Sequence, residues 1–272
     1  MEIPSDDSTF KFMEKQRLIE DASPSKNYLL HICCVALLFR LLRAYFDTGV
    51  EDDALLYLKM AHSWAEAGTD AAYSHSNWIP PLLPWLLSCS IRAGLDTNTF
   101  GEVLGALLGS LLPFFVYHTG QRLGLCKQAI FFAAILVAVH PLLIRYSVDN
   151  IRDSLYIPLF CASLYFAVSA VKTQNYRWWI ALGCTCGLAL LTRREAPEIL
   201  ILPIIYAGIQ HFTGNKQQWG KNIVAGYVIA VTVLCMVTTP AYMYLKETKC
   251  RWSPLDSTLQ KIIADLRSGV KK

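Results

Sequence analysis

Residues 47–88 of the chain read DTGVEDDALLYLKMAHSWAEAGTDAAYSHSNWIPPLLPWLLS. This stretch is polar, aromatic and led by acids, and it separates two long apolar segments. Irregular polar backbone near lipid needs water or protein partners, so a loop this long is more than a connection between two spans requires. We therefore expect residues 47–88 to form an active-site loop, with the apolar segments around it crossing a membrane.

The composition indicates a membrane protein. The 272 residues are 54% hydrophobic and 17% charged, with a mean hydropathy of +0.34, which is more apolar than a single soluble core. The net charge of +4 is small and the basic residues are scattered, which argues against a nucleic-acid partner. Most of the nine cysteines lie in apolar runs, where a thiol packs as a small hydrophobe.

We expect an all-α, polytopic bundle of about seven spans, because a helix needs roughly 20 apolar residues to cross a bilayer. The candidate spans are 27–46, 100–118, 129–146, 155–171, 178–191, 199–212 and 223–244. The apolar segment 82–91 is too short to cross and is expected at the interface or packed under the loop.

The chain thus divides into a cytoplasmic tail (1–26), a membrane domain (27–245) and an amphipathic tail (246–272). We expect the last of these to dock on the membrane surface, with partner binding or disorder as the alternatives.

The loop charges predict the orientation. With the N-terminus in the cytoplasm, ten basic residues fall on the cytoplasmic side, as the positive-inside tendency requires. The opposite side also carries basic residues, namely Arg43, Lys59, Arg92, Arg145, Arg152, Arg193 and Arg194. An anionic ligand at that face would explain them, and membrane anchoring is the alternative. Arg40 and Arg43, at the end of the first span, are expected to snorkel to the interface.

The first chemical candidate is the acidic start of a helix in the loop. Asp52 and Asp53 precede a good helical pattern, so one is expected at the N-cap and the other in the first turn. Capping is the alternative to a catalytic role. Asp53 shares a helical face with Tyr57, and Asp52 shares one with Lys59. A carboxylate placed there could act as general base on an acceptor hydroxyl, and the lysine could bind phosphate.

Two further motifs follow in the chain. Trp78, Pro80 and Pro81 form a proline elbow that fixes an extended entry to the next helix. Arg152 and Asp153 lie at the start of the fourth span, where an ionisable group is costly unless it is paired or functional. A helix cap, or a surface pair between Arg152 and the preceding Asp149, is the bland alternative.

The fourth motif ends the fifth span with Arg193, Arg194 and Glu195. Two adjacent guanidinium groups at an interface suit a phosphate or a pyrophosphate. Anchoring to lipid headgroups is the alternative.

In order and spacing, these motifs resemble the glycosyltransferase superfamily C membrane enzymes, in the branch of the protein O-mannosyltransferases and the aminoarabinose transferases of lipid A. The likeness covers about residues 40–206. It consists of the acid and tyrosine helix at Asp53–Tyr57, the segment PPLLPWLL at 80–87, the acid Asp153, and the segment GLALLTR at 187–193.

The resemblance implies transfer of a sugar from a polyprenyl-phosphate carrier to a lipid, glycan or protein acceptor at the extracytoplasmic face. Asp53, or Asp52 if the register differs by one, would deprotonate the acceptor, and Asp153 would be a second acid, contacting sugar, acceptor or a divalent cation. Lys59, Arg193 and Arg194 would hold the carrier phosphate, and Tyr57, Trp78, Pro80, Pro81, Arg152 and Glu195 would line the pocket. The membrane would be the plasma membrane if the source is bacterial.

The chain also departs from that branch. It ends after about seven spans where relatives continue, Arg194 stands where a proline or glycine is usual, and Arg152 precedes Asp153 where relatives are uncharged. These departures leave open a minimal enzyme, one partner of a complex or an inactive remnant. A transporter or flippase of an anionic lipid-linked substrate is the competing function, and a non-catalytic scaffold is the third.

Overall fold

The structure is a computed structural model that describes residues 28–46, 49, 51–212 and 220–246. Within these ranges the elements are helices joined by short connections, with no strand, so the all-α prediction is confirmed. The predicted N-terminal tail, and the C-terminal tail beyond Lys246, lie outside the described residues. The elements are α2 (Tyr28–Phe46), α3 (Asp52–Ala67), α4 (Thr69–His75), α5 (Leu82–Arg92), α6 (Thr97–Ser110), α7 (Leu112–Leu123), α8 (Lys127–Val139), α9 (Pro141–Val148), α10 (Arg152–Thr173), α11 (Tyr176–Leu190), η1 (Ala196–Leu200), α12 (Ile201–Phe212) and α13 (Gly220–Lys246).

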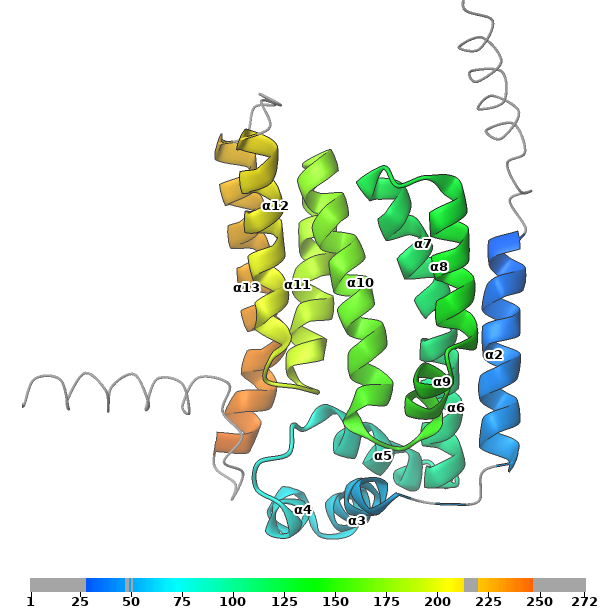
Figure 1. Cartoon of the computed structure of the whole chain (residues 1–272). Coiled ribbons are helices and arrows are strands. Elements are labelled where there is room, and N and C mark those ends of the chain that lie inside the picture. The colour runs from blue at the N-terminus through cyan, green and yellow to red at the C-terminus, as the bar shows by residue number, and fades with distance from the viewer. Residues whose placement is uncertain (1–27, 47–48, 50, 213–219, 247–272) are drawn as a thin grey trace, which may run out of the picture.

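Four helical segments of the described chain are long and apolar enough to cross a membrane. They are α2, the α6–α7 pair as one span, α10, and residues Ile223–Lys246 of α13. The pair α8 and α9 makes a fifth span if the two are counted as one. Helices α11 and α12 run beside them (Figure 1) but have only 15 and 12 residues, fewer than the roughly 20 that a crossing needs. The chain is therefore a multi-pass membrane protein with four or five candidate spans in the part described, and the predicted count of seven is not confirmed.

The predicted span 129–146 is not one continuous helix. Helices α8 and α9 meet at a bend of 50° at His140, whose backbone is extended, and Pro141 begins α9. Proline has no N–H to donate to the preceding turn and its ring clashes with that turn, which breaks the helix here.

Arg40 does not reach the interface as predicted. Its side chain is fully buried between helices, where Nη1 donates to the carbonyls of Ala36 at 2.9 Å and Ala138 at 3.3 Å. Its Nε donates to the hydroxyl of Ser147 at 3.1 Å. These bonds replace hydration at two of the three guanidinium nitrogens, while the buried Nη2 has no hydrogen-bond partner among the described residues. Arg40 is therefore a structural residue of the α2 interface.

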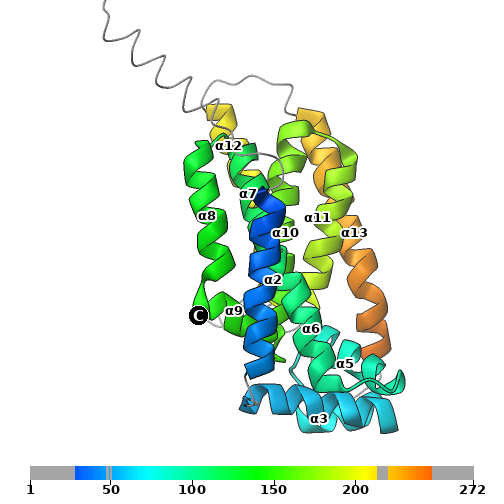
Figure 2. The ribbon, with the colours of Figure 1, turned by 90° about the vertical axis from the view of Figure 1, so that its right-hand side faces the viewer.

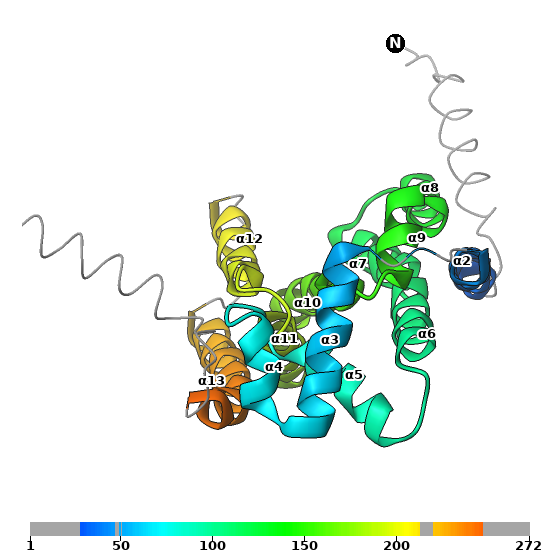
Figure 3. The same cartoon turned by 90° about the horizontal axis from the view of Figure 1, so that it is seen from below.

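The described residues of the loop 47–88 form helices that lie across one end of the bundle. Figures 1 and 2 show α3 beneath the ends of the spans, and Figure 3, seen from below, shows α3 and α4 crossing that end. Tyr57 and Trp64 of α3 pack with Leu87 of α5 and Leu190 of α11 in one buried cluster. As predicted, the short apolar helix α5 packs under the loop.

Candidate active site

The acids of the loop stand in the first turn of α3. Glu51 is the N-cap residue, its side chain makes no capping bond, and Asp52 and Asp53 both fall within the first turn. The prediction that one aspartate is the N-cap is therefore wrong by one residue. Acids in a first turn are favoured by the partial positive charge of the helix N-terminus. Both aspartates are exposed, so their carboxylates are accessible to solvent or a ligand.

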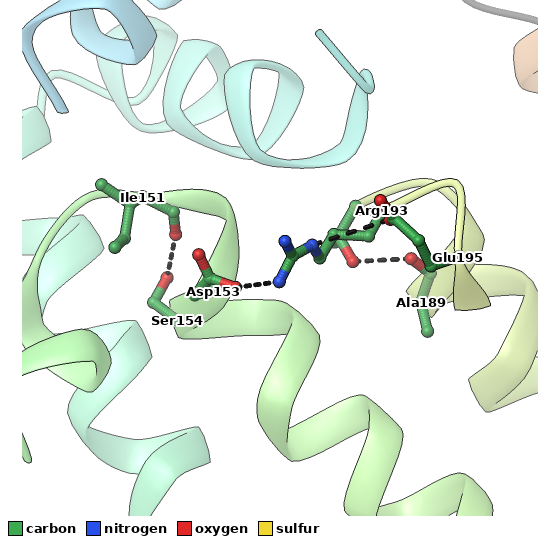
Figure 4. A network of polar contacts seen from close by, with 7 residues as sticks. Ile151, Asp153, Ser154, Ala189, Arg193 and Glu195 are labelled. Atoms are coloured by element: carbon green, nitrogen blue, oxygen red, sulfur yellow. Dashed lines mark hydrogen bonds and ion pairs between the residues drawn. The ribbon is translucent and has the colours of Figure 1, made fainter. Parts of the chain in front are cut away.

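Asp153 and Arg193 meet although 40 residues separate them in the chain. Arg193 Nη1 donates to Asp153 Oδ1 at 2.7 Å, and both side chains are mostly buried, 29% and 23% exposed (Figure 4). On its other side, Arg193 Nε lies 3.7 Å from Glu195 Oε2, and the guanidinium stacks over the ring of Tyr156 at 5.1 Å. Packing of α10 against α11 thus brings two of the predicted motifs together.

Tyr57 lies among the charges of three separate segments. Burial of this side chain, which is 5% exposed, raises the pKa of its hydroxyl to about 12. The positive charges of Arg152 and Arg193 lower that pKa, and the negative charges of Asp53 and Asp153 raise it. Tyr57 also shares a buried cluster with Leu155 and Leu191, which lie two residues from Asp153 and from Arg193. The acidic start of α3, the start of α10 and the end of α11 therefore converge on one place, at the same end of the bundle.

The proline elbow joins this place through backbone contacts. Pro80 and Pro81 are buried, and α5 begins directly after them at Leu82. The N–H of Leu82 donates to the carbonyl of Leu191 at 3.1 Å, which ties the elbow to the end of α11. Arg194 Nη2 donates to the carbonyl of Trp78 at 3.2 Å. All four sequence motifs thus meet at one end of the protein, as their order in the chain predicted.

Lys59 is not brought to this cluster. It follows Tyr57 by two residues, which places it about 200° round the helix axis, and it is exposed while Tyr57 is buried. Trp78 and Glu195 are also exposed, at 55% and 59%, at the rim. Arg152 is half-buried beside Asp153, and it does not pair with Asp149, which lies instead 3.5 Å from Arg145.

An apolar groove of about 370 Å³ opens beside the cluster. Its walls come from α3, the elbow with α5, the end of α11 and the end of α13, and they include Trp64, Pro81, Trp85, Leu191, Pro240 and Tyr244. Leu191 lies two residues before Arg193, and Pro81 belongs to the segment that Arg194 contacts. A hydrophobic chain lying in the groove would therefore carry its polar end toward the two arginines.

A metal site is not apparent in the described part of the chain, where no group of three or more His, Cys, Asp and Glu side chains is arranged to hold an ion. Asp153 is paired with Arg193 instead. A divalent cation therefore stays a prediction from the resemblance alone.

One residue and one contact near the cluster were not predicted from the sequence. Tyr156 lies one helical turn after Asp153, and that spacing could have placed it beside the acid. Arg145 forms an ion pair with Glu51, 94 residues away, and no local pattern signals that contact.

The chain matches a family of known proteins over much of its length. The family model described as dolichyl-phosphate-mannose-protein mannosyltransferase matches residues 79–244, which is more than half of the chain and includes both prolines of the elbow, Asp153 and the two arginines. The acids of α3 precede the matched range. No curated protein matches the chain in a sequence comparison. The match favours a transferase over a transporter or flippase. The chain therefore belongs to the dolichyl-phosphate-mannose-protein mannosyltransferase family and is a membrane glycosyltransferase of the superfamily C type.

Proposed function

We propose that the protein transfers a sugar from a polyprenyl-phosphate carrier to an acceptor hydroxyl at the extracytoplasmic face of the membrane. One observation carries the proposal. Acids from α3 and α10 and the guanidinium group of Arg193 lie around Tyr57, next to an apolar groove suited to a lipid chain.

The carrier would use both the groove and the arginines. Its isoprenoid chain would lie against apolar and aromatic side chains such as Trp85 and Tyr244, removing apolar surface from water. Its phosphate would then reach Arg193 and Arg194, whose planar guanidinium groups can each donate two hydrogen bonds to phosphate oxygens. Because Lys59 points outward, the proposal assigns it no phosphate contact.

The transfer step would be a single displacement at the sugar. The acceptor oxygen forms a bond to the anomeric carbon while the bond from that carbon to the phosphate oxygen breaks, and its electron pair leaves with the carrier phosphate. Asp53, or Asp52 in the alternative register, takes the proton of the acceptor hydroxyl. The arginines stabilise the charge that grows on the departing phosphate. Because the acceptor oxygen attacks from the side opposite the departing phosphate, the anomeric configuration is inverted. Asp153 contacts the sugar or the acceptor.

The charge distribution supports an outward-facing site. At the opposite end of the bundle, the connections α7–α8 and α10–α11 carry Arg122, Lys127, Lys172 and Arg177 and no acid (Figure 1). Basic connections favour the cytoplasmic side, which supports an outside position for the loop 47–88.

The test is release of free polyprenyl phosphate when purified protein is incubated with a polyprenyl-phosphate sugar and candidate acceptors. Asp53→Asn keeps the size of the side chain and removes the base, so we expect release to fall by about 10²-fold or more. Since Glu51 is the N-cap, this change does not remove a cap. Glu66→Gln, at an exposed acid near the other end of α3, is the matched control. If Asp53→Asn and Asp52→Asn each released polyprenyl phosphate at the wild-type rate, neither residue would be the base.

A further inference from the structure

The start of α3 is held by a contact outside the proposed active site. The carboxylate of Glu51, the N-cap residue, pairs with Arg145 of α9. Asp52 and Asp53 follow directly in the chain. Any movement of Glu51 would therefore move the two acids relative to Asp153 and Arg193.

Helix α9, which carries Arg145, is itself fixed on two sides. On α6, Gly105 and Gly109 let it approach closely, because a Cβ on Gly105 would overlap the carbonyl oxygen of Ser147. On α2, Arg40 donates to the same serine and to the last turn of α8, just before the bend. The bend and these contacts fix the direction of α9.

The end of α9 is fastened to the start of α6 as well. Asn150, which is 3% exposed, donates from Nδ2 to the carbonyl of Asn98 at 3.1 Å and to its Oδ1 at 2.8 Å. Arg145 therefore projects from a rigid part of the bundle. The far end of α3 is held similarly, since Arg92 Nη2 donates to the carbonyl of Trp64 at 3.2 Å.

We propose that Arg145 is a positioning residue which, through Glu51, holds the first turn of α3 so that Asp53 faces the cluster of Tyr57, Asp153 and Arg193. The inference rests on the proposed transfer. The pair is 48% and 37% exposed, and pairs of this kind add little to global stability. They can still fix local geometry, and a displacement of about 1 Å at a reacting group can lower a rate by about 10²-fold.

The experiment compares Arg145→Gln, Glu51→Gln, the double variant and Arg145→Lys in the full-length protein. Each neutral variant should lower kcat about tenfold, with KM close to wild type. Tm should stay close to wild type in Glu51→Gln, whereas Arg145→Gln also removes the contact with Asp149. The double variant should be no worse than Arg145→Gln alone, because that change already removes the contact with Glu51. Arg145→Lys should recover most of the activity. Arg177→Gln, an exposed arginine at the opposite end of the bundle, is the control.

A second measurement does not depend on catalysis. Hydrogen exchange of the amides of residues 51–57 should accelerate in Arg145→Gln and stay unchanged in Arg177→Gln. Unchanged exchange would overturn the proposal whatever the activity, and so would faster exchange with an unaltered kcat. If the wild type transfers no sugar, the proposed function fails, while the exchange result still decides whether Arg145 holds α3.

Discussion

Replacing Asp153 by asparagine should strengthen phosphate binding while it impairs transfer. In the structure, Arg193 donates to Asp153 at 2.7 Å, so a carrier phosphate must compete with this carboxylate for the guanidinium. Asparagine has nearly the same shape but no charge. The change therefore removes the competitor and leaves Arg193 in place.

The magnitude follows from the geometry of the pair. Opposite unit charges about 4 Å apart attract by about 4 kcal/mol at an effective dielectric constant near 20. Water reaches both side chains, which are 29% and 23% exposed, and Glu195 remains 3.7 Å from Arg193 Nε. We therefore expect a net gain of about 1 kcal/mol for the phosphate, or about fivefold in Kd.

The assay is a titration of detergent-purified protein with a short-chain polyprenyl monophosphate at constant ionic strength, followed by intrinsic tryptophan fluorescence. Glu66→Gln should bind like the wild type. Equal or weaker binding by Asp153→Asn would refute the reasoning. Weakening that occurs only with Mg²⁺ present would mean that Asp153 acts through a metal ion.

Three further variants test the packing around the site. Gly105→Ala should destabilise the protein by about 1–3 kcal/mol, measured as a loss of Tm, because the new methyl group overlaps the Ser147 carbonyl. Arg40→Ala should cost about 3 kcal/mol or more, because it opens a void and leaves the Ala138 carbonyl at the bend without its donor. Tyr57→Phe should remove a loss of stability that the wild type shows at alkaline pH. The pKa of the Tyr57 hydroxyl is about 12 in the folded state and 10 in the unfolded state, so its ionisation lowers the free energy of unfolding of the wild type by about 2–3 kcal/mol as pH rises from 10 to 12. The difference in Tm between the two proteins should therefore narrow or reverse over that interval.

The sequence predicted where the motifs would meet better than how they would interact. Successive spans alternate in direction, so counting them was enough to place the loop 47–88, Asp153 and Arg193 at one end of the bundle. The contact between Asp153 and Arg193 depends on how α10 packs against α11, and spacing along the chain does not specify it. The outward position of Lys59 was open to prediction, because Ala54, Tyr57, Ala61 and Trp64 recur at helical spacing and define the buried face of α3.

Arg40 shows where a local rule failed. A basic residue within two turns of the end of an apolar helix commonly snorkels, so its position alone favoured the interface. Burial of Arg40 became favourable for two reasons. The bend before Pro141 leaves a carbonyl of α8 without a helical donor, and a serine of α9 supplies a hydroxyl. Both acceptors are more than 90 residues away in the chain. No single-helix pattern can show them.

The charges of the proposed site link donor binding to acceptor chemistry. Around Tyr57, the negative charges of Asp53 and Asp153 oppose the positive charges of Arg152 and Arg193. In the proposed mechanism, an arriving phosphate bears negative charge and competes with Asp153 for the guanidinium of Arg193. The displaced Asp153 would then be free to accept a hydrogen bond from the sugar or the acceptor. We expect this competition to make the second acid more available when the carrier is bound, which would favour chemistry in the occupied site.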